Sequence, residues 1–169
     1  MIFKVETGEG LDDATSYVDV DYADSRIAAM FPEDTQWSSK STPQKQLLLM
    51  QSSRFIDGML KWTSVLFLLT QRLSWPRDKF KDSEGRTIAE GEVPVKIKTA
   101  AVDLALESIT ADIFDEGVLL ESQKYGSSSE SYVGPERDGG NILVRQIMRD
   151  FQNSGYGRKH SSLIELQRA

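Results

Sequence analysis

The stretch Gln71-Arg72-Leu73-Ser74-Trp75-Pro76-Arg77 is the most informative part of this 169-residue chain. Proline disfavours the α region for the residue before it, so we expect Trp75 to be extended and any element there to end abruptly. We expect a short helix near residues 70–73. Trp62, Leu73 and Trp75 are predicted to form a hydrophobic knot that closes this region. For Arg77 two roles stay open, a cation–π contact with Trp75 and a structural ion pair.

Composition indicates one soluble globular domain, or one domain with an extension, since 39% of residues are hydrophobic and 27% are charged. The absence of cysteine excludes disulfides and thiolate chemistry. His160 is the single histidine, which excludes zinc sites built from several imidazoles. The longest apolar run, residues 65–69, is too short to span a bilayer, and no signal peptide is evident. We therefore expect synthesis in the cytoplasm and no membrane partner.

Charge is spread unevenly along the chain. The net charge of −6 argues against a general polyanion binder. Residues 1–35 hold nine acids against Lys4 and Arg26, which gives −7, and residues 141–169 hold five bases against Asp150 and Glu165, which gives +3. Two interpretations stay open. The acidic head and basic tail could complement each other or a partner between subunits, or they are two unrelated solvated segments.

Helical spacing and capping residues predict three helices in the first two thirds of the chain. The first is expected over 20–30 after an Asp19 cap, and the second over 42–59 from a Thr42-Pro43 start. The third is opened by Val93-Pro94 and should end by 115–117, with Gly117 just beyond it. Trp37 is expected to pack as a lid on the core.

The remaining elements are shorter. Turn residues predict a small hairpin or ordered loop over residues 80–88. Two short extended arms are expected over residues 118–124 and 127–133. A last helix, capped by Asn141, is expected over residues 142–152. The predicted fold is therefore mainly α: a small helical domain of three to four helices with a short β-hairpin and an extended C-terminal arm.

We divide the chain into a helical body, residues 1–133, and an arm, residues 134–169. The arm comprises the helix at about 142–152 and a strand-like tail over 161–169. The serine- and glycine-rich stretch before the helix has too little apolar content to build its own core. It is either flexible or ordered by lying on another subunit.

No catalytic constellation is present in the sequence. The chain lacks a phosphate-binding P-loop and a dinucleotide-binding glycine motif, and it lacks a nucleophile elbow. Paired carboxylates such as Asp12 and Asp13 lie in strongly polar stretches, whereas catalytic pairs need burial to separate their pKa values. We therefore expect a protein that is not an enzyme and has no catalytic residue, cofactor or metal.

Several motifs, taken in order and spacing, resemble one protein family. They are Ser16-Tyr17-Val18, Trp37, the run from Gln51 to Asp57, Trp62, the Gln71–Arg77 stretch, Val93-Pro94, and the arms around Tyr125-Gly126. Together they resemble the head–tail connector (adaptor) proteins of tailed bacteriophages, whose relatives are often labelled DnaT-like single-stranded-DNA-binding proteins. The family commonly has a glycine soon after the residue matched by Trp62, whereas Thr63-Ser64 follow here.

This resemblance implies a structural protein of the virion neck, made in the host cytoplasm and placed at the capsid–tail junction. It would form a dodecameric ring between portal and tail proteins, active in viral genome packaging. DNA would pass through the bore without sequence-specific binding. An acidic bore would suit sliding DNA, because it offers no gain from counterion release.

Two sets of residues follow from this interpretation. The structural core motif comprises Trp62, Gln71, Leu73, Trp75, Pro76 and Arg77. The portal-docking residues comprise Arg145, Ile147, Arg149, Phe151, Leu163, Ile164 and Leu166.

The alternative function is single-stranded-DNA binding, as the DnaT-like label implies. It predicts basic grooves with exposed aromatic platforms. Trp62, Trp75, Arg72 and Arg77 are the candidates, although the tryptophans lie among leucines and look internal. A third possibility is a regulatory or chaperone-like interaction module.

Overall fold

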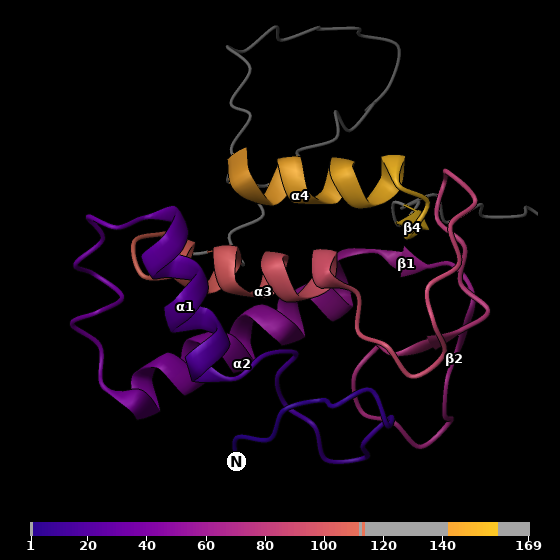
Figure 1. The fold of residues 1–169 in the computed structure, drawn as a ribbon, viewed down its shortest axis with the longest axis horizontal. Coiled ribbons are helices and arrows are strands. Elements are labelled where there is room, and N and C mark those ends of the chain that lie inside the picture. The colour runs from indigo at the N-terminus through magenta and orange to yellow at the C-terminus, as the bar shows by residue number, and fades with distance from the viewer. Residues whose placement is uncertain (1, 112, 114–141, 159–169) are drawn as a thin grey trace, which may run out of the picture.

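Four helices form the framework of the computed structural model, which describes residues 2–111, 113 and 142–158 (Figure 1). They are α1 (Val20–Met30), α2 (Thr42–Met59), α3 (Val95–Glu107) and α4 (Ile142–Asn153). The strands are two residues each: β1 (Lys61–Trp62), β2 (Val65–Leu66), β3 (Arg77–Asp78) and β4 (Gly157–Arg158). β1 pairs antiparallel with β4, and β2 with β3. The predicted mainly α fold is confirmed.

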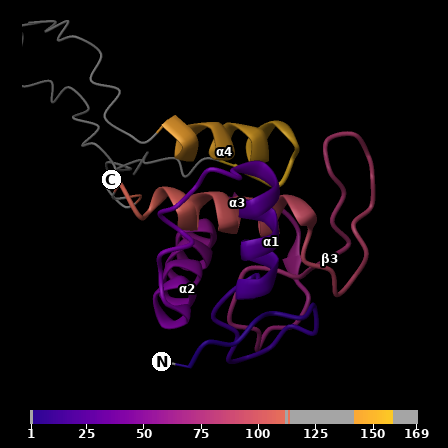
Figure 2. The same cartoon turned by 60° about the vertical axis from the view of Figure 1, so that its left-hand side comes forward.

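Helix α3 occupies the centre of the molecule. In Figures 1 and 2 it lies between α2 and α4, with α1 across the end where α3 finishes. Ala100, Ala101 and Ala105 of α3 are buried, as are Ile97 and Leu104. Small side chains let a neighbouring helix approach closely, and α2 packs directly on α3.

The helix starts follow their capping residues. Asp19 caps α1 as predicted, since its carboxylate accepts a hydrogen bond from the Tyr22 N–H at 2.6 Å. The predicted Thr42-Pro43 start takes Thr42 as the cap of α2, which is one residue late. Ser41 is the N-cap, and its N–H donates to the Gln44 side chain at 2.9 Å. This pairing is half of a capping box.

The predicted end of α3 was wrong. The helix ends at Glu107, because the backbone then changes to shorter turns, in which the N–H of Ile109 donates to Leu106 at 3.2 Å. Ile113 is nevertheless 3% exposed. The apolar spacing therefore continues past the point where the helix stops.

Residues 60–92 are mostly irregular, and the helix predicted over 70–73 is wrong. A turn takes its place, closed by a hydrogen bond from the Gln71 N–H to the Leu68 carbonyl at 3.3 Å. The ordered loop predicted over 80–88 is confirmed, since Lys81 and Thr87 form an antiparallel bridge.

The described end of the chain packs on the rest of the domain. Phe151 of α4 is 1% exposed, and Tyr156 just before β4 is 5% exposed. Their rings join three others from the middle of the chain, with neighbouring ring centroids 4.6 to 5.9 Å apart. We call this set the aromatic cluster: Trp62, Trp75, Phe80, Phe151 and Tyr156.

The predicted arm is described only in part. Its helix, expected over about 142–152, is confirmed as α4, and residues 142–158 lie against the body instead of extending from it. The two predicted extended arms within 118–133, the boundary at 133/134, the Asn141 cap and the strand-like tail over 161–169 lie outside the described residues. Gly117 lies outside them too.

Candidate nucleic-acid interface

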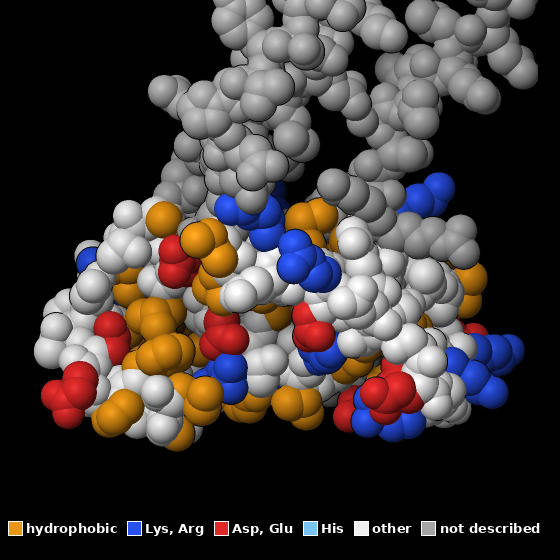
Figure 3. All heavy atoms as spheres, turned by 90° about the horizontal axis from the view of Figure 1, so that it is seen from above, with side chains coloured by type: hydrophobic (Ala, Val, Ile, Leu, Met, Phe, Trp, Pro, Cys, Tyr) orange, Lys and Arg blue, Asp and Glu red, His pale blue; other side chains and the backbone are white. Residues whose placement is uncertain are grey.

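Acidic side chains gather at one end of the molecule. The end formed by α1 and the loop after it carries Asp19, Asp21, Asp24, Glu33 and Asp34. Residues 61–81 lie at the opposite end, around β1, β2 and β3 (Figures 1 and 2). We call residues 61–81 the basic segment. Seen from above, Lys and Arg side chains lie toward this end together with Asp and Glu side chains, whereas hydrophobic side chains gather on the α1 side (Figure 3).

The basic segment has a local charge of +4. It contains five bases and one acid, Asp78; the bases are Lys61, Arg72, Arg77, Lys79 and Lys81. All of these bases except Arg77 are exposed. The chain also exposes apolar side chains here, since Val65 is 65% exposed and Leu69 is 94% exposed.

Gln71 holds the turn that precedes Arg72. Its side-chain oxygen accepts from the Leu68 N–H at 2.8 Å, and its amide nitrogen donates to the carbonyls of Leu73 at 2.7 Å and Pro76 at 2.9 Å. Gln71 is itself buried. One enclosed side chain thus replaces the regular backbone hydrogen bonds that this loop lacks.

Arg77 also acts from inside the loop. Its guanidinium donates to the carbonyls of Ser74 and Ser64, both at 2.8 Å, and to the Ser64 hydroxyl at 3.3 Å. Only 8% of the residue is exposed, and this burial lowers the pKa of Arg77. These contacts include neither the cation–π contact with Trp75 nor the direct ion pair predicted for Arg77. Its guanidinium instead joins neighbouring segments by donating to their carbonyl oxygens.

A mostly buried carboxylate anchors the same loop to α2. Asp57 accepts a hydrogen bond from the Tyr17 hydroxyl, and its two oxygens accept from the Ser74 N–H at 3.2 Å. The Tyr17 oxygen in turn accepts from the Trp75 N–H at 3.2 Å. Burial raises the pKa of Asp57 to about 6, although the hydrogen bonds from Tyr17 and Ser74 and the charge of Arg77 oppose this. Burial also raises the pKa of Tyr17, which stays protonated.

Five of the six residues of the structural core motif are buried, and Trp62 is the exception. Trp75 is fully buried and meets Trp62 edge-on at 5.9 Å between centroids, while Leu73 is 6% exposed. The peptide bond between Trp75 and Pro76 is cis. Trp62 is half-buried, and its indole N–H donates inward to the Asp57 carbonyl at 3.2 Å.

Only one of the four residues named for DNA binding is well placed on the surface. Arg72 is exposed, whereas Trp75 and Arg77 are buried and Trp62 is half-buried. The sequence analysis did not name Lys61, Lys79 and Lys81 as candidates for DNA binding. Counting charge over residues 61–81 alone would have found them, because the charge of the whole chain conceals this segment.

The residues predicted to dock onto a portal do not form one exposed set. Arg145 and Ile147 are half-buried, Arg149 is exposed, and Phe151 is enclosed in the aromatic cluster. Leu163, Ile164 and Leu166 lie outside the described residues.

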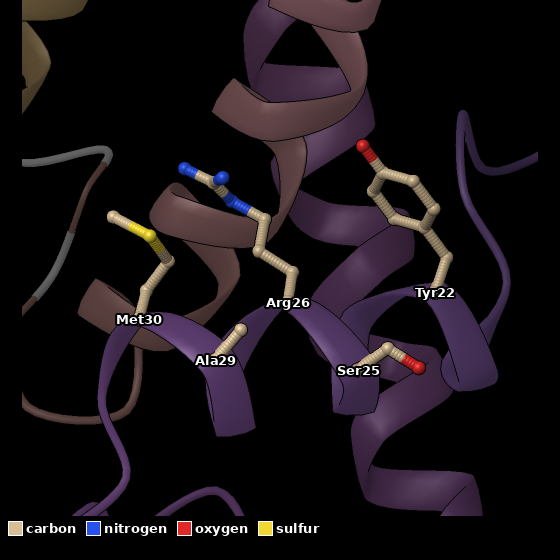
Figure 4. A pocket seen from close by; sticks show the side chains of 5 residues that line it. All are labelled: Tyr22, Ser25, Arg26, Ala29 and Met30. Carbon is tan, nitrogen blue, oxygen red and sulfur yellow. The ribbon is translucent and has the colours of Figure 1, made fainter.

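A shallow open depression on α1 is a second place to consider. Tyr22, Ser25, Arg26, Ala29 and Met30 line it, with Arg26 reaching toward α3 (Figure 4). Both nitrogens used by Arg26 bond to Asp103 of α3, at 2.9 to 3.1 Å. Its charge is therefore committed to holding α1 on α3, and the depression lies at the acidic end.

The residues that the structure describes include no helix that is both long and apolar enough to span a bilayer. They also contain no group of three or more His, Cys, Asp or Glu side chains that could hold a metal ion.

The fold and this surface define a small helical domain with a segment that exposes both basic and apolar side chains. Residues 1–169, the whole chain, match the family model described as "Putative DnaT-like ssDNA binding protein", and the chain belongs to this family. Comparisons with curated proteins and with solved structures gave no match.

The prediction of a phage head–tail connector is therefore wrong. The family match supports single-stranded-DNA binding, the alternative, and it overturns the ring, the portal and tail partners and the role in the virion neck. The physical reason lies in the residues behind the resemblance. Gln71, Trp75 and Arg77 face inward and hold the loop together, so they carry information about the fold and none about the partner.

Proposed function

We propose that this protein binds single-stranded DNA through the basic segment, and that it does so as a binding protein, not as an enzyme. One observation carries the proposal. In a chain of the DnaT-like family, the basic segment exposes four bases at the end of the molecule opposite the acidic helix α1.

Phosphate neutralisation supplies the affinity in this proposal. Lysine and arginine side chains that neutralise phosphates release counterions, which favours binding. Lys61, Arg72, Lys79 and Lys81 are the exposed bases that do so. Lys61 lies in β1, which pairs with β4 at this edge.

Apolar side chains supply the contact with the nucleobases of the DNA. Val65, Leu68 and Leu69 are 65%, 43% and 94% exposed, and they lie between Lys61 and Arg72 in the chain. Unpaired bases expose apolar faces that are stacked away in a duplex, and covering them removes apolar area from water. This arrangement favours single strands over duplexes.

Salt dependence provides the test. Four phosphate contacts predict a slope of about −3 for log K against log salt on a single strand, or about a fiftyfold loss between about 50 and about 200 mM. Fluorescence anisotropy with a labelled oligothymidylate measures this slope. Arg72→Ala, Lys79→Ala and Lys81→Ala should each reduce its magnitude by about 0.7.

The matched control is Lys40→Ala, which removes a base between α1 and α2 at the acidic end. It should leave both affinity and slope unchanged. The proposal fails if the unsubstituted protein does not bind at low salt, if the control weakens binding as much as the three variants do, or if a duplex of the same length competes equally well.

A further inference from the structure

Asp57 lies directly beneath the basic segment and has no part in the phosphate contacts proposed above. It is near the end of α2, four residues before Lys61. Its carboxylate is hydrogen-bonded to Tyr17 from the N-terminal segment and to Ser74 from the loop. A mostly buried acid in this position therefore acts on the same surface that the DNA would use.

The negative charge of ionised Asp57 offsets the positive charge of Arg77. The guanidinium of Arg77 donates to Ser64 and Ser74 and makes no direct hydrogen bond to the carboxylate. The two groups nevertheless attract each other through space. With Asp57 ionised, the enclosed charge of Arg77 is balanced, and the basic segment together with Asp57 carries +3. With Asp57 neutral the sum is +4.

We propose that Asp57 sets the affinity of the basic segment for single-stranded DNA: its ionised form weakens binding, and its protonated form leaves Arg77 unbalanced and strengthens binding. This inference rests on the proposed function. Enclosure in the protein makes the effect larger than that of a surface carboxylate, because the field of a buried charge is screened less.

The charged and titratable groups that face Asp57 are Tyr17 of the N-terminal segment and Arg77 of β3. Tyr17 stays protonated because burial raises its pKa, and Arg77 stays charged between pH ~5 and ~7.5. The pKa of Asp57, about 6, therefore places the change in affinity near pH 6.

The experiment compares the full chain with Asp57→Asn, both carrying His160→Gln. The His160 substitution is needed because an ordinary histidine titrates at about 6.5. Binding of a rhodamine-labelled oligothymidylate is measured by anisotropy at constant ionic strength. One unit charge about 10 Å from a phosphate in water predicts binding at least about twofold tighter at pH ~5 than at pH ~7.5. Asp57→Asn should bind tightly at both pH values.

Tyr17→Phe adds a second readout. The Tyr17 hydroxyl stabilises the ionised form of Asp57, so its loss should move the midpoint of the affinity change to higher pH. A purely structural role for Asp57 would weaken binding without moving a midpoint. Circular dichroism establishes that each variant is folded. If Asp57→Asn does not fold, the Tyr17→Phe midpoint decides the matter.

The outcomes separate the two proposals. If the full chain does not bind oligothymidylate at any pH, the proposed function fails and this inference fails with it. If the full chain binds, the inference alone is overturned by a constant affinity between pH ~5 and ~7.5. It is equally overturned by a pH dependence that persists unchanged in Asp57→Asn, or by a midpoint that Tyr17→Phe leaves in place.

Discussion

Asp57 should make the stability of the free protein depend on pH. The carboxyl titrates at about 6 in the folded chain against 3.8 for the ordinary side chain. Each pH unit between the two values corresponds to about 1.4 kcal/mol. Ionising Asp57 in the folded state therefore costs about 3 kcal/mol of the free energy of unfolding.

The sign follows from where the proton is held. Between pH ~4 and ~6 the folded chain keeps the proton of Asp57 and the unfolded chain has released it, so stability falls as pH rises. The contribution of this group is fully present below 3.8, is lost as pH passes through about 6, and is constant above that. Most paired surface carboxylates act in the opposite direction.

Urea unfolding at several pH values, followed by tryptophan fluorescence, measures this contribution without DNA. The Asp57 component of the free energy of unfolding should fall by about 2 kcal/mol between pH ~4 and ~7 in the unsubstituted chain, and this component should be absent in Asp57→Asn. Asp12→Asn is the matched control, since Asp12 is exposed in the N-terminal segment. Parallel pH curves for the unsubstituted chain and Asp57→Asn would refute the reasoning.

Two further predictions concern packing. Phe151→Ala should destabilise the fold by about 3–5 kcal/mol because it empties a buried ring site, whereas Ile142→Ala on the same helix removes an exposed side chain, and equal losses in urea unfolding would contradict the packing described. Gly8→Ala should cost at least about 1–3 kcal/mol, because φ is +102° and an added Cβ would lie 1.9 Å from the Gly91 carbonyl oxygen. Gly58→Ala, in α2 with nothing within 4 Å, should instead gain about 0.5–1 kcal/mol, and thermal melts that rank the two glycine variants the other way would show the close approach to be wrong.

The helices were predictable because local sequence determines them. Asp19 and the apolar residues Ala23 and Ile27 fix the start and the buried face of α1. The end of α3 was not predictable in the same way, because Ile109 and Ile113 keep an apolar spacing after the backbone has left the helix.

The conformation of the basic segment could not be predicted from the sequence, for a different reason. Its shape depends on hydrogen bonds from Gln71 and Arg77 to carbonyls that no periodic pattern announces. The exposed lysine and arginine residues were recognisable in the sequence as a local excess of positive charge. Trp62 and Trp75, the aromatic residues predicted to contact DNA, instead pack against each other in the aromatic cluster.

The aromatic cluster has a consequence for how the protein is made. Phe151 and Tyr156 close a core whose other rings come from Trp62, Trp75 and Phe80. While only about the first 140 residues have been synthesised, the central rings of the nascent chain therefore still lack this covering. Chaperones that recognise exposed apolar surface would bind this nascent chain until α4 emerges.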